Sequence, residues 1–288
     1  MLEKTSCYQS MHPSTLSLIR AAILEDFGSG DITSEFFIPA DAKSRANLVA
    51  RERGVMSGAE VALAVFREID PLMQVAALVT DGTWFEKGTV LMEIAGPTRS
   101  VLSAERTALN FLQRLCRVAT QTRRYVDAVK PHPVKVLDTR KTTPGWRLLE
   151  KGAVRDGGGT NHRIGLYDQV MVKDNHLVAN SGTSELQGAI DRVKAARPGI
   201  KVHLEVDSLE QMSRFLQLRG VDMILLDNMA PALLRDAVKL NAGRVFLEAS
   251  GGITLETIAN VAATGVDAIS VGALTHSARA LDLALDFI

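Results

Sequence analysis

The feature that most constrains the fold is a regular alternation of short apolar runs and helical patterns, which fills the chain after residues 131–133. Such runs are typical of strands buried on both faces. Strands that alternate with helices predict right-handed crossovers and a parallel sheet. About six such units predict an α/β barrel or part of one. The expected strands cover residues 134–137, 169–172, 202–206, 223–226, 245–247 and 268–271, and the expected helices cover 184–196, 208–218, 231–240 and 255–263.

The first part of the chain predicts a different architecture. An apolar spacing that begins after Pro13 predicts a helix over residues 13–26, and the glycine-containing run that follows predicts a loop with a capped turn before Phe36. A long amphipathic segment predicts a helix over 103–129 with Ser103 at its N-cap. Short β-rich pieces separated by glycines predict a mainly antiparallel sheet with one helix, formed by strands 46–51, 54–57, 73–78 and 89–94 and helix 58–68.

Composition narrows the classes of function. The chain has 288 residues, enough for one large domain or two, and its 46% hydrophobic and 23% charged residues are average for a soluble globular protein. The 33 basic and 33 acidic side chains cancel, which argues against a general binder of nucleic acid or membrane surfaces. Cys7 and Cys116 have no paired spacing, so neither a disulfide framework nor a zinc site is expected. With no apolar leader or membrane span in the sequence, we expect a cytoplasmic protein.

Charged groups and glycines follow nearly every expected strand of the barrel. The active sites of α/β barrels lie at the carboxyl ends of the strands, so side chains at these positions are candidates for chemistry. A purely structural barrel would not need this arrangement. The residues concerned are Asp138, Arg140, Lys141, Lys173, Asp174, Asn175, Glu205, Asp207, Asp227, Asn228, Glu248, Ser250 and Gly272.

Residues 134–176 concentrate basic side chains although the whole chain is neutral, which predicts an anionic ligand. A solvated basic face is the alternative interpretation. Several of these charges directly follow apolar runs, and a buried strand holds such charges in place, so we favour a binding site. The basic residues, grouped around three consecutive glycines at 157–159, are Arg140, Lys141, Arg147, Lys151, Arg155, His162, Arg163, Lys173 and His176.

Two glycine sites predict a phosphate-binding region. Ser250, Gly251 and Gly252 follow a late strand and open an expected helix at Thr254, and Gly272 ends the next strand. Glycines let the backbone approach an anion closely, and the late loops of α/β barrels commonly bind phosphate.

Long ordered motifs reveal a family resemblance. The runs DTRKTTPG, GGGTNHRIGLYDQVMVKDNH, LEVDSLEQ, LLDN, LEASGGI and GVDAISVGALTHS resemble the quinolinate phosphoribosyltransferase family, and the similarity extends from residues 25–33 to 275–277. The resemblance implies an N-terminal α/β sandwich domain over 1–115 and an incomplete parallel α/β barrel over 116–275. It also implies a helix over 276–288 that returns to the first domain.

The resemblance also implies roles for individual residues. Arg140, His162, Arg163 and Lys173 would form the quinolinate pocket, and Arg106 would reach it from the neighbouring subunit of a homodimer. Thr139 would also bind substrate. Lys141 would lie nearer the pyrophosphate. Glu205 and Asp227 would face the ribose and a Mg²⁺ ion and, with Lys141, would be catalytic. The glycines Gly251, Gly252 and Gly272 would hold the 5-phosphate of phosphoribosyl pyrophosphate. Their neighbours Ser250, Val271 and Ala273 would also bind substrate.

The implied reaction joins the pyridine nitrogen of quinolinate to the anomeric carbon with loss of pyrophosphate and carbon dioxide, giving nicotinate mononucleotide for NAD synthesis. Arginines grip two adjacent carboxylates well, which favours a diacid. Two alternatives are a phosphoribosyltransferase for another pyridine carboxylate and a non-catalytic sensor of a phosphoribosyl ligand. The sequence departs from the family at His203, where many relatives have a second glutamate; strand alternation predicts that His203 and Glu205 point the same way.

Overall fold

The computed structural model describes residues 11–177 and 182–288, so the expectations for Cys7 and its surroundings lie outside the described residues. The chain divides into two compact units. The first unit contains the chain up to Arg123 together with Thr142–Gly158 and Ser277–Ile288. The second unit contains Arg124–Lys141 and Gly159–His276. The segment 142–158, expected inside the barrel domain, therefore belongs to the first unit.

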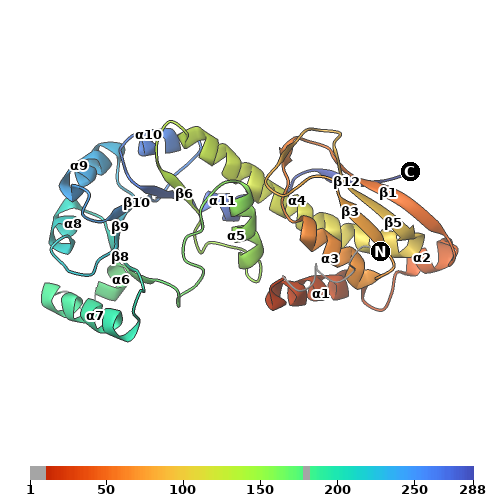
Figure 1. Cartoon of the computed structure of the whole chain (residues 1–288), viewed down its shortest axis with the longest axis horizontal. Coiled ribbons are helices and arrows are strands. Elements are labelled where there is room, and N and C mark those ends of the chain that lie inside the picture. The colour runs from red at the N-terminus through yellow and green to blue at the C-terminus, as the bar shows by residue number, and fades with distance from the viewer. Residues whose placement is uncertain (1–10, 178–181) are drawn as a thin grey trace. The chain divides into compact units, whose positions relative to one another are not determined.

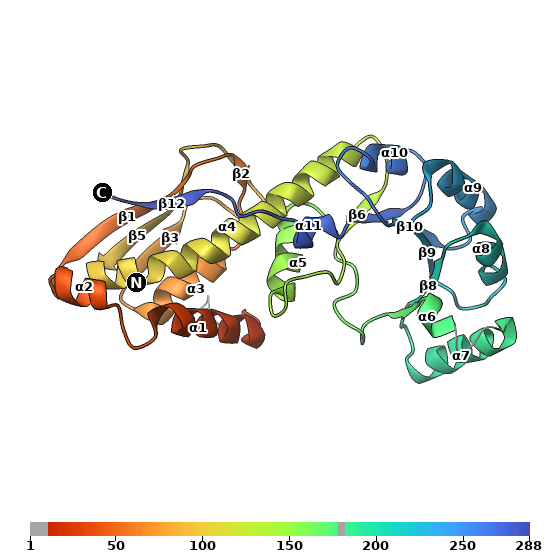
Figure 2. The same ribbon diagram turned by 180° about the vertical axis from the view of Figure 1, so that it is seen from behind.

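The first unit is a two-layer α/β sandwich built on a four-stranded antiparallel sheet in the order β12-β1-β5-β3. Figures 1 and 2 both show helices α1 and α3 on the same side of this sheet. Strand β1 pairs with β5 over most of its length and places Ala46 and Leu48 in the core. The elements of the sandwich are β1 (Lys43–Ala50), β3 (Gln74–Ala77), β5 (Val90–Pro97), β12 (Leu283–Phe287), α1 (Pro13–Phe27) and α3 (Ala59–Ile69), and a separate two-stranded ladder joins β2 (Gly54–Val55) to β4 (Trp84–Phe85).

Three expectations for helices in this unit are wrong. The expected helix over 276–288 is instead strand β12, which pairs with β1 at the edge of the sheet. The run expected as a loop contains the short helix α2 (Ile32–Phe37), because the Asp31 side chain accepts the backbone N–H of Ser34 and caps it. The long helix α4 (Thr98–Val129) begins five residues before the expected cap, so Ser103 lies inside it and donates to the carbonyl of Arg99.

The segment Thr142–Gly158 is anchored to α4 by a buried ion pair. It contains helix α5 (Arg147–Asp156), whose Glu150 is fully buried. The carboxylate of Glu150 lies 2.8 Å from the guanidinium of Arg114 on α4 and also accepts the backbone N–H of Thr143 at 3.0 Å. Trp146 stacks on Phe111 of α4 with ring centroids 4.7 Å apart. These contacts explain why the segment belongs to the first unit.

The second unit is an open parallel barrel. Its six strands form one sheet in the order β6-β11-β10-β9-β8-β7, and Figure 1 shows the helices outside the strands. Among the described residues no ladder joins the edge strands β6 and β7, so the barrel is incomplete, as expected. The strands are β6 (Lys135–Leu137), β7 (Val170–Val172), β8 (Val202–Val206), β9 (Met223–Asp227), β10 (Phe246–Ser250) and β11 (Ala268–Ser270).

Helices connect these strands as the sequence predicts, with one change. The last long connection forms α10 (Ile258–Ala262) only after a turn at residues 254–257, so the helix expected to open at Thr254 starts later. Its N-terminus is therefore separated from Gly251 and Gly252. The remaining helices are α6 (Asp174–Leu177), α7 (Thr183–Ala196), α8 (Leu209–Phe215), α9 (Pro231–Asn241) and α11 (Ala273–His276).

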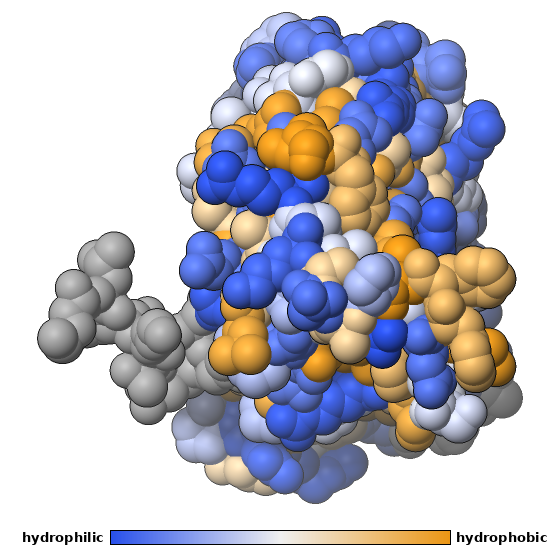
Figure 3. Space-filling model, turned by 90° about the vertical axis from the view of Figure 1, so that its right-hand side faces the viewer, coloured by the Kyte–Doolittle hydropathy of each residue, from blue (hydrophilic) through white to orange (hydrophobic). Residues whose placement is uncertain are grey.

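Apolar side chains remain exposed on the first unit. They lie on α1 and α2 and include Leu24, Ile32, Phe36 and Phe37. Figure 3 views this end of the molecule and shows hydrophobic groups among the hydrophilic ones. No helix in the described part of the chain is both long and apolar enough to cross a membrane.

Candidate active site

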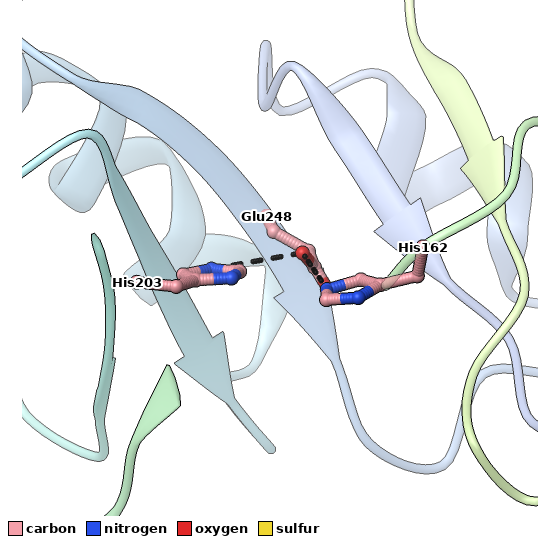
Figure 4. A group of neighbouring side chains, drawn as sticks. All are labelled: His162, His203 and Glu248. Carbon is pink, nitrogen blue, oxygen red and sulfur yellow. Dashed lines mark hydrogen bonds and ion pairs between the residues drawn. The ribbon is translucent and has the colours of Figure 1, made fainter. Parts of the chain in front are cut away.

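Two histidines meet one buried carboxylate inside the barrel. Glu248 projects from the middle of β10 and His203 from β8, and His162 approaches from the loop before β7 (Figure 4). The Oε2 atom of Glu248 lies 3.1 Å from Nε2 of His162 and 3.6 Å from Nε2 of His203. The two imidazole rings are stacked, with centroids 5.6 Å apart and planes inclined by 11°. Strands β8 and β10 are separated by β9, so the curvature of the sheet is what brings these side chains together.

The charges in this cluster are set by burial and by the histidines. Desolvation acts to raise the pKa of Glu248, but the hydrogen bond from His162, the nearby histidines and the Ser270 hydroxyl together lower it below its ordinary value. The fully buried His203 has its pKa lowered to about 4, first by burial and despite the attraction of Glu248. At neutral pH the cluster therefore holds a carboxylate beside an uncharged His203.

Cationic side chains gather beside this cluster. The pKa of Arg163 is lowered mainly by burial and, to a smaller extent, by repulsion from Arg140. The two guanidinium groups therefore lie close enough to repel each other. Lys173 follows β7 and forms an ion pair with Glu205 on the neighbouring strand β8. The charges of Arg163 and Lys173 also contribute to lowering the pKa of His203, so both cations lie near its ring. An anion with more than one negative charge would relieve the repulsion between the arginines.

A buried aspartate fixes the loop that carries His162 and Arg163. Asp138 follows β6, is fully buried and accepts the backbone N–H of His162 at 2.8 Å. A parallel bridge between Leu137 and Thr160 aligns this loop with β6. The loop is therefore placed by main-chain contacts and not by its charged side chains alone.

Lys141 lies against the glycine that follows β11. A side chain at Gly272 would approach Cδ of Lys141 to 3.1 Å and Nε2 of His276 to 3.0 Å, so only glycine leaves both side chains undisturbed. The Thr275 hydroxyl donates to the carbonyl of Lys141 at 2.8 Å, and the Thr139 hydroxyl accepts its N–H at 3.0 Å. The expected binding residues Thr139, Lys141, Val271, Gly272 and Ala273 thus lie at the adjacent ends of β6 and β11.

A second glycine region lies at the adjacent ends of β9 and β10. Gly251 has a φ of +99°, and a Cβ atom there would lie 2.1 Å from Oδ1 of Asn228. Asn228 also has a positive φ, of +53°, and donates from its side chain to Asp227 at 2.8 Å. Its backbone N–H bonds to the carbonyl of Ser250, so this turn is tied to β10. The space around Gly252 is open, which suits a backbone that an anion can approach.

The long basic stretch is divided between the two units. Arg147, Lys151 and Arg155 lie on α5 of the first unit, where Lys151 is fully buried, whereas Arg140, His162, Arg163 and Lys173 belong to the second unit. Arg106 is exposed on α4 and pairs with no acidic side chain of the described residues. The structure brings together Arg140, His162, Arg163, Lys173 and Glu205, and it leaves Arg106 available for a contact outside its own chain.

The expected magnesium ligands have suitable chemistry. Glu205 and Asp227 lie on the neighbouring strands β8 and β9 near their carboxyl ends, and carboxylates are preferred ligands of this hard cation. The ion pair with Lys173 would have to loosen for Glu205 to act as a ligand. His162, His203 and Glu248 form a second group of possible metal ligands, with ligand atoms within 4.8 Å of one another.

Glu248 is the residue whose importance the sequence least reveals. It directly follows the predicted strand 245–247 and is therefore a candidate, although the structure places it in the middle of β10. Its contact with His203 across β9 depends on sheet curvature, which no local pattern encodes. Asp138 is similar, because its role is to bind a backbone N–H from another loop.

Comparison with known proteins decides the family. Residues 31–116 match the model of the quinolinate phosphoribosyl transferase N-terminal domain, and residues 118–286 match the model of the C-terminal domain of the same family. The chain belongs to the quinolinate phosphoribosyltransferase family. The predicted resemblance is confirmed, and so is the predicted α/β fold.

Members of the quinolinate phosphoribosyltransferase family match nearly the whole chain. The nicotinate-nucleotide pyrophosphorylase (carboxylating) of Mycobacterium leprae is 43% identical over 274 residues, which cover 93% of this chain and 95% of the relative. A chloroplastic nicotinate-nucleotide pyrophosphorylase (carboxylating) of Oryza sativa is 40% identical over 285 residues, covering 93% of this chain and 76% of the relative. The solved structure of the nicotinate-nucleotide pyrophosphorylase from Francisella tularensis superimposes with a TM-score of 0.89 at 36% identity, covering 96% of this chain and 98% of that one.

Proposed function

We propose that this chain transfers the phosphoribosyl group of phosphoribosyl pyrophosphate to the nitrogen of quinolinate and releases carbon dioxide, pyrophosphate and nicotinate mononucleotide. The observation that carries the proposal is the pair Arg140 and Arg163, whose proximity lowers the pKa of Arg163 after the larger effect of burial. Two guanidinium groups held together in this way, beside Lys173, fit two adjacent carboxylates. Membership of the family supports the same reaction.

The phosphate and ribose would occupy the neighbouring strand ends. We assign Ser250, Gly251, Gly252, Val271, Gly272 and Ala273 to the 5-phosphate, because Gly252 leaves the backbone open to an anion and Gly251 and Gly272 have no side chain to cover it. Asp227 and Glu205 would face the ribose, where positive charge develops as pyrophosphate leaves. Lys141, held against Gly272 by main-chain contacts, would lie near the departing pyrophosphate.

Catalysis in this proposal needs no protein nucleophile. The arginines and Lys173 orient the pyridine nitrogen toward the anomeric carbon, and positioning of this kind can supply a large part of the rate enhancement. The pyridinium formed by the transfer stabilises the electrons left when the 2-carboxylate departs as carbon dioxide. If Mg²⁺ is bound by Glu205 and Asp227, it supplies charge neutralisation for pyrophosphate.

A homodimer with a shared site is part of the proposal. Arg106 is exposed and would enter the pocket of the partner subunit, and the exposed apolar side chains of α1 and α2 offer surface that a second copy could cover. We also propose that the chain uses Mg²⁺ and acts in the cytoplasm.

The test is turnover with competing substrates. The purified chain is incubated with phosphoribosyl pyrophosphate, Mg²⁺ and either quinolinate or nicotinate, and both carbon dioxide and nicotinate mononucleotide are measured. Turnover of quinolinate alone is expected. Turnover of nicotinate alone would support the assignment of the phosphate site and reject that of the diacid pocket. Inactivity with both substrates would favour a non-catalytic sensor.

A further inference from the structure

We propose that Glu248 is a positioning residue that fixes the tautomer and the plane of His162 in the acid-binding pocket. The inference rests on the proposed function for the identity of the ligand. The arrangement of Glu248, His162 and Arg163 is independent of that ligand and carries the argument.

Glu248 is a buried carboxylate that accepts hydrogen bonds from two other segments. Its side chain is 1% exposed. One oxygen accepts the Ser270 hydroxyl from the neighbouring strand β11, and the other accepts Nε2 of His162 at 3.1 Å. A carboxylate buried without such partners would be strongly destabilising, so the position of the His162 ring and the charge of Glu248 depend on each other.

The hydrogen bonds define the tautomer of His162. Its Nδ1 atom accepts the backbone N–H of Arg163 at 2.7 Å. A backbone N–H can only donate, so Nδ1 carries no proton and the proton of the neutral ring is on Nε2, where it is donated to Glu248. The ring is thus held at both nitrogens. The opposite tautomer would lose both hydrogen bonds at once.

This tautomer argues against a metal ion in the cluster. A metal would need the Nε2 lone pair of His162, which is not available while Nε2 carries the proton given to Glu248. The three-residue group therefore serves as a hydrogen-bonded unit in this arrangement, although the spacing of its ligand atoms would admit a cation.

The orientation of His162 is transmitted to a pocket cation. The main chain of His162 is fixed by Asp138, and the ring of His162 in turn binds the N–H of Arg163. Rotation of the ring would release the main chain of Arg163. The guanidinium of Arg163 lies near that of Arg140 and is repelled by it. Glu248 therefore acts on the pocket through His162, without touching a reacting atom.

His203 supports the same ring from the other side. It is fully buried, stacks on His162 and approaches Oε2 of Glu248 to 3.6 Å. The side-chain amide of Gln169 lies 3.1 Å from its Nδ1. We expect this packing to limit rotation of the His162 plane.

The experiment combines nitrogen NMR with kinetics on the full-length chain. Histidine labelled with ¹⁵N reports the tautomer directly, and the signals of His162 are assigned by their loss in His162→Asn. We expect the Nε2–H form in the wild type. In Glu248→Ala the ring keeps only the N–H of Arg163 as a partner and can turn away from it, so we expect a mixture of tautomers. We also expect the KM for quinolinate to rise on the order of tenfold to a hundredfold in Glu248→Ala, as for the loss of a hydrogen bond to a charged group, with a smaller change for phosphoribosyl pyrophosphate.

Two further variants separate positioning from folding. In Glu248→Gln the amide oxygen can still accept Nε2–H, so this variant should keep the tautomer and lie closer to the wild type, even if Glu248→Ala does not fold. Asp267→Asn is the matched control, because the Asp267 carboxylate accepts the N–H of Leu247 on the same strand β10 and takes no part in the hydrogen bonds of His162 described above. It should lower stability without changing the tautomer or the ratio of the two KM values.

Three results would overturn the inference. The first is an Nδ1–H form or a doubly protonated His162 in the wild type. The second is an unchanged tautomer and KM in a folded Glu248→Ala. The third is binding of one Zn²⁺ per chain that is lost in His203→Ala, which would assign the cluster to a metal. A wild type that does not turn over quinolinate but retains the Nε2–H form, lost in Glu248→Ala, would reject the proposed function and support the positioning role.

Discussion

Lys173 and Glu205 neutralise each other across neighbouring strands of the barrel, one at the end of β7 and the other on β8. Family resemblance assigns Lys173 to the acid substrate and Glu205 to the ribose and metal. In the structure the two groups form an ion pair that is partly exposed at Lys173 and largely buried at Glu205. The proposed roles of Lys173 and Glu205 therefore require that substrate binding exchanges this ion pair for contacts with the ligands.

Replacement of Lys173 by methionine should weaken binding of the diacid. The change removes a cation and leaves the carboxylate of Glu205 uncompensated, so we expect the KM for quinolinate to rise roughly tenfold to a hundredfold. Steady-state kinetics at saturating phosphoribosyl pyrophosphate measures this change. Lys201→Met is the control, since Lys201 pairs with Asp222 at the opposite ends of the strands and should retain wild-type KM. Equal effects of the two variants would contradict a specific role for Lys173.

Arg106 should act in the site of the partner subunit. We expect Arg106→Ala and Arg140→Ala to be nearly inactive alone, because each site then lacks one of its arginines. In mixed dimers, one of the two sites receives both wild-type arginines, so activity should return to about a quarter of the wild-type level for random exchange of subunits. Activity is measured after unfolding and refolding the two variants together. Absence of recovery in a mixture that contains mixed dimers would reject the shared site.

Gly251 should not tolerate a side chain. Its φ of +99° is unfavourable for other residues, and a Cβ atom would overlap Asn228. We expect Gly251→Ala to destabilise the second unit by about 1–3 kcal/mol and to raise the KM for phosphoribosyl pyrophosphate more than that for quinolinate. Gly243→Ala is a matched control, because Gly243 also has a positive φ of +75° and lies after α9, away from the turn. A Cβ atom there would meet no other part of the described chain within 4 Å. Gly243→Ala should lower stability without affecting either KM.

Asp222 should make the stability of the second unit depend on pH. Burial tends to raise its pKa, but the hydrogen bonds and charge of Lys194, the N–H of Val202 and Lys201 together lower it below the ordinary value of 3.8. A lowered folded-state pKa means that the stabilisation is complete above the unfolded-state pKa and is lost as pH falls through the folded-state pKa. Asp222→Asn should therefore cost about 1–3 kcal/mol at neutral pH and progressively less in acid.

Urea unfolding of the wild type and Asp222→Asn, at neutral pH and at a pH below 3.8, measures this dependence. Asp236→Asn provides the comparison, because Asp236 is exposed and its ion pair among the described residues is with Lys239 on α9. Its effect should be small at both pH values. A constant difference between wild type and Asp222→Asn at all pH values would show that the charge of Asp222 is not what stabilises the unit.

The sequence predicts the barrel well and the edges of the sandwich poorly. Strand β8 matches its predicted bounds because strands buried on both faces produce continuous apolar runs that need no tertiary information to recognise. The helix predicted over 276–288 is wrong, because residues 283–287 become strand β12 only by pairing with β1, more than two hundred residues away in sequence. The two-residue strand β4 is missed for a similar reason, as it is defined by its partner β2.

The same distinction applies to the site. Residues at strand ends can be listed from the sequence, because a parallel sheet collects them at one edge. The contacts between side chains of the barrel cannot be predicted in the same way. Glu248 approaches His203, for example, only because the sheet curves across the intervening strand β9. The assignments of Lys141, Glu205 and Asp227 as catalytic residues remain predictions for the experiments above.

Strand β12 also sets an order of events during synthesis. Residues 283–287 pair with β1, which begins at Lys43, whereas every strand of the barrel has been made by Ser270. A ribosome therefore delivers the whole barrel before it delivers the last strand of the sandwich. Until then one edge of β1 is unpaired in the nascent chain, where it can recruit a chaperone or a strand from another chain. Truncation of a few C-terminal residues would make that temporary state permanent.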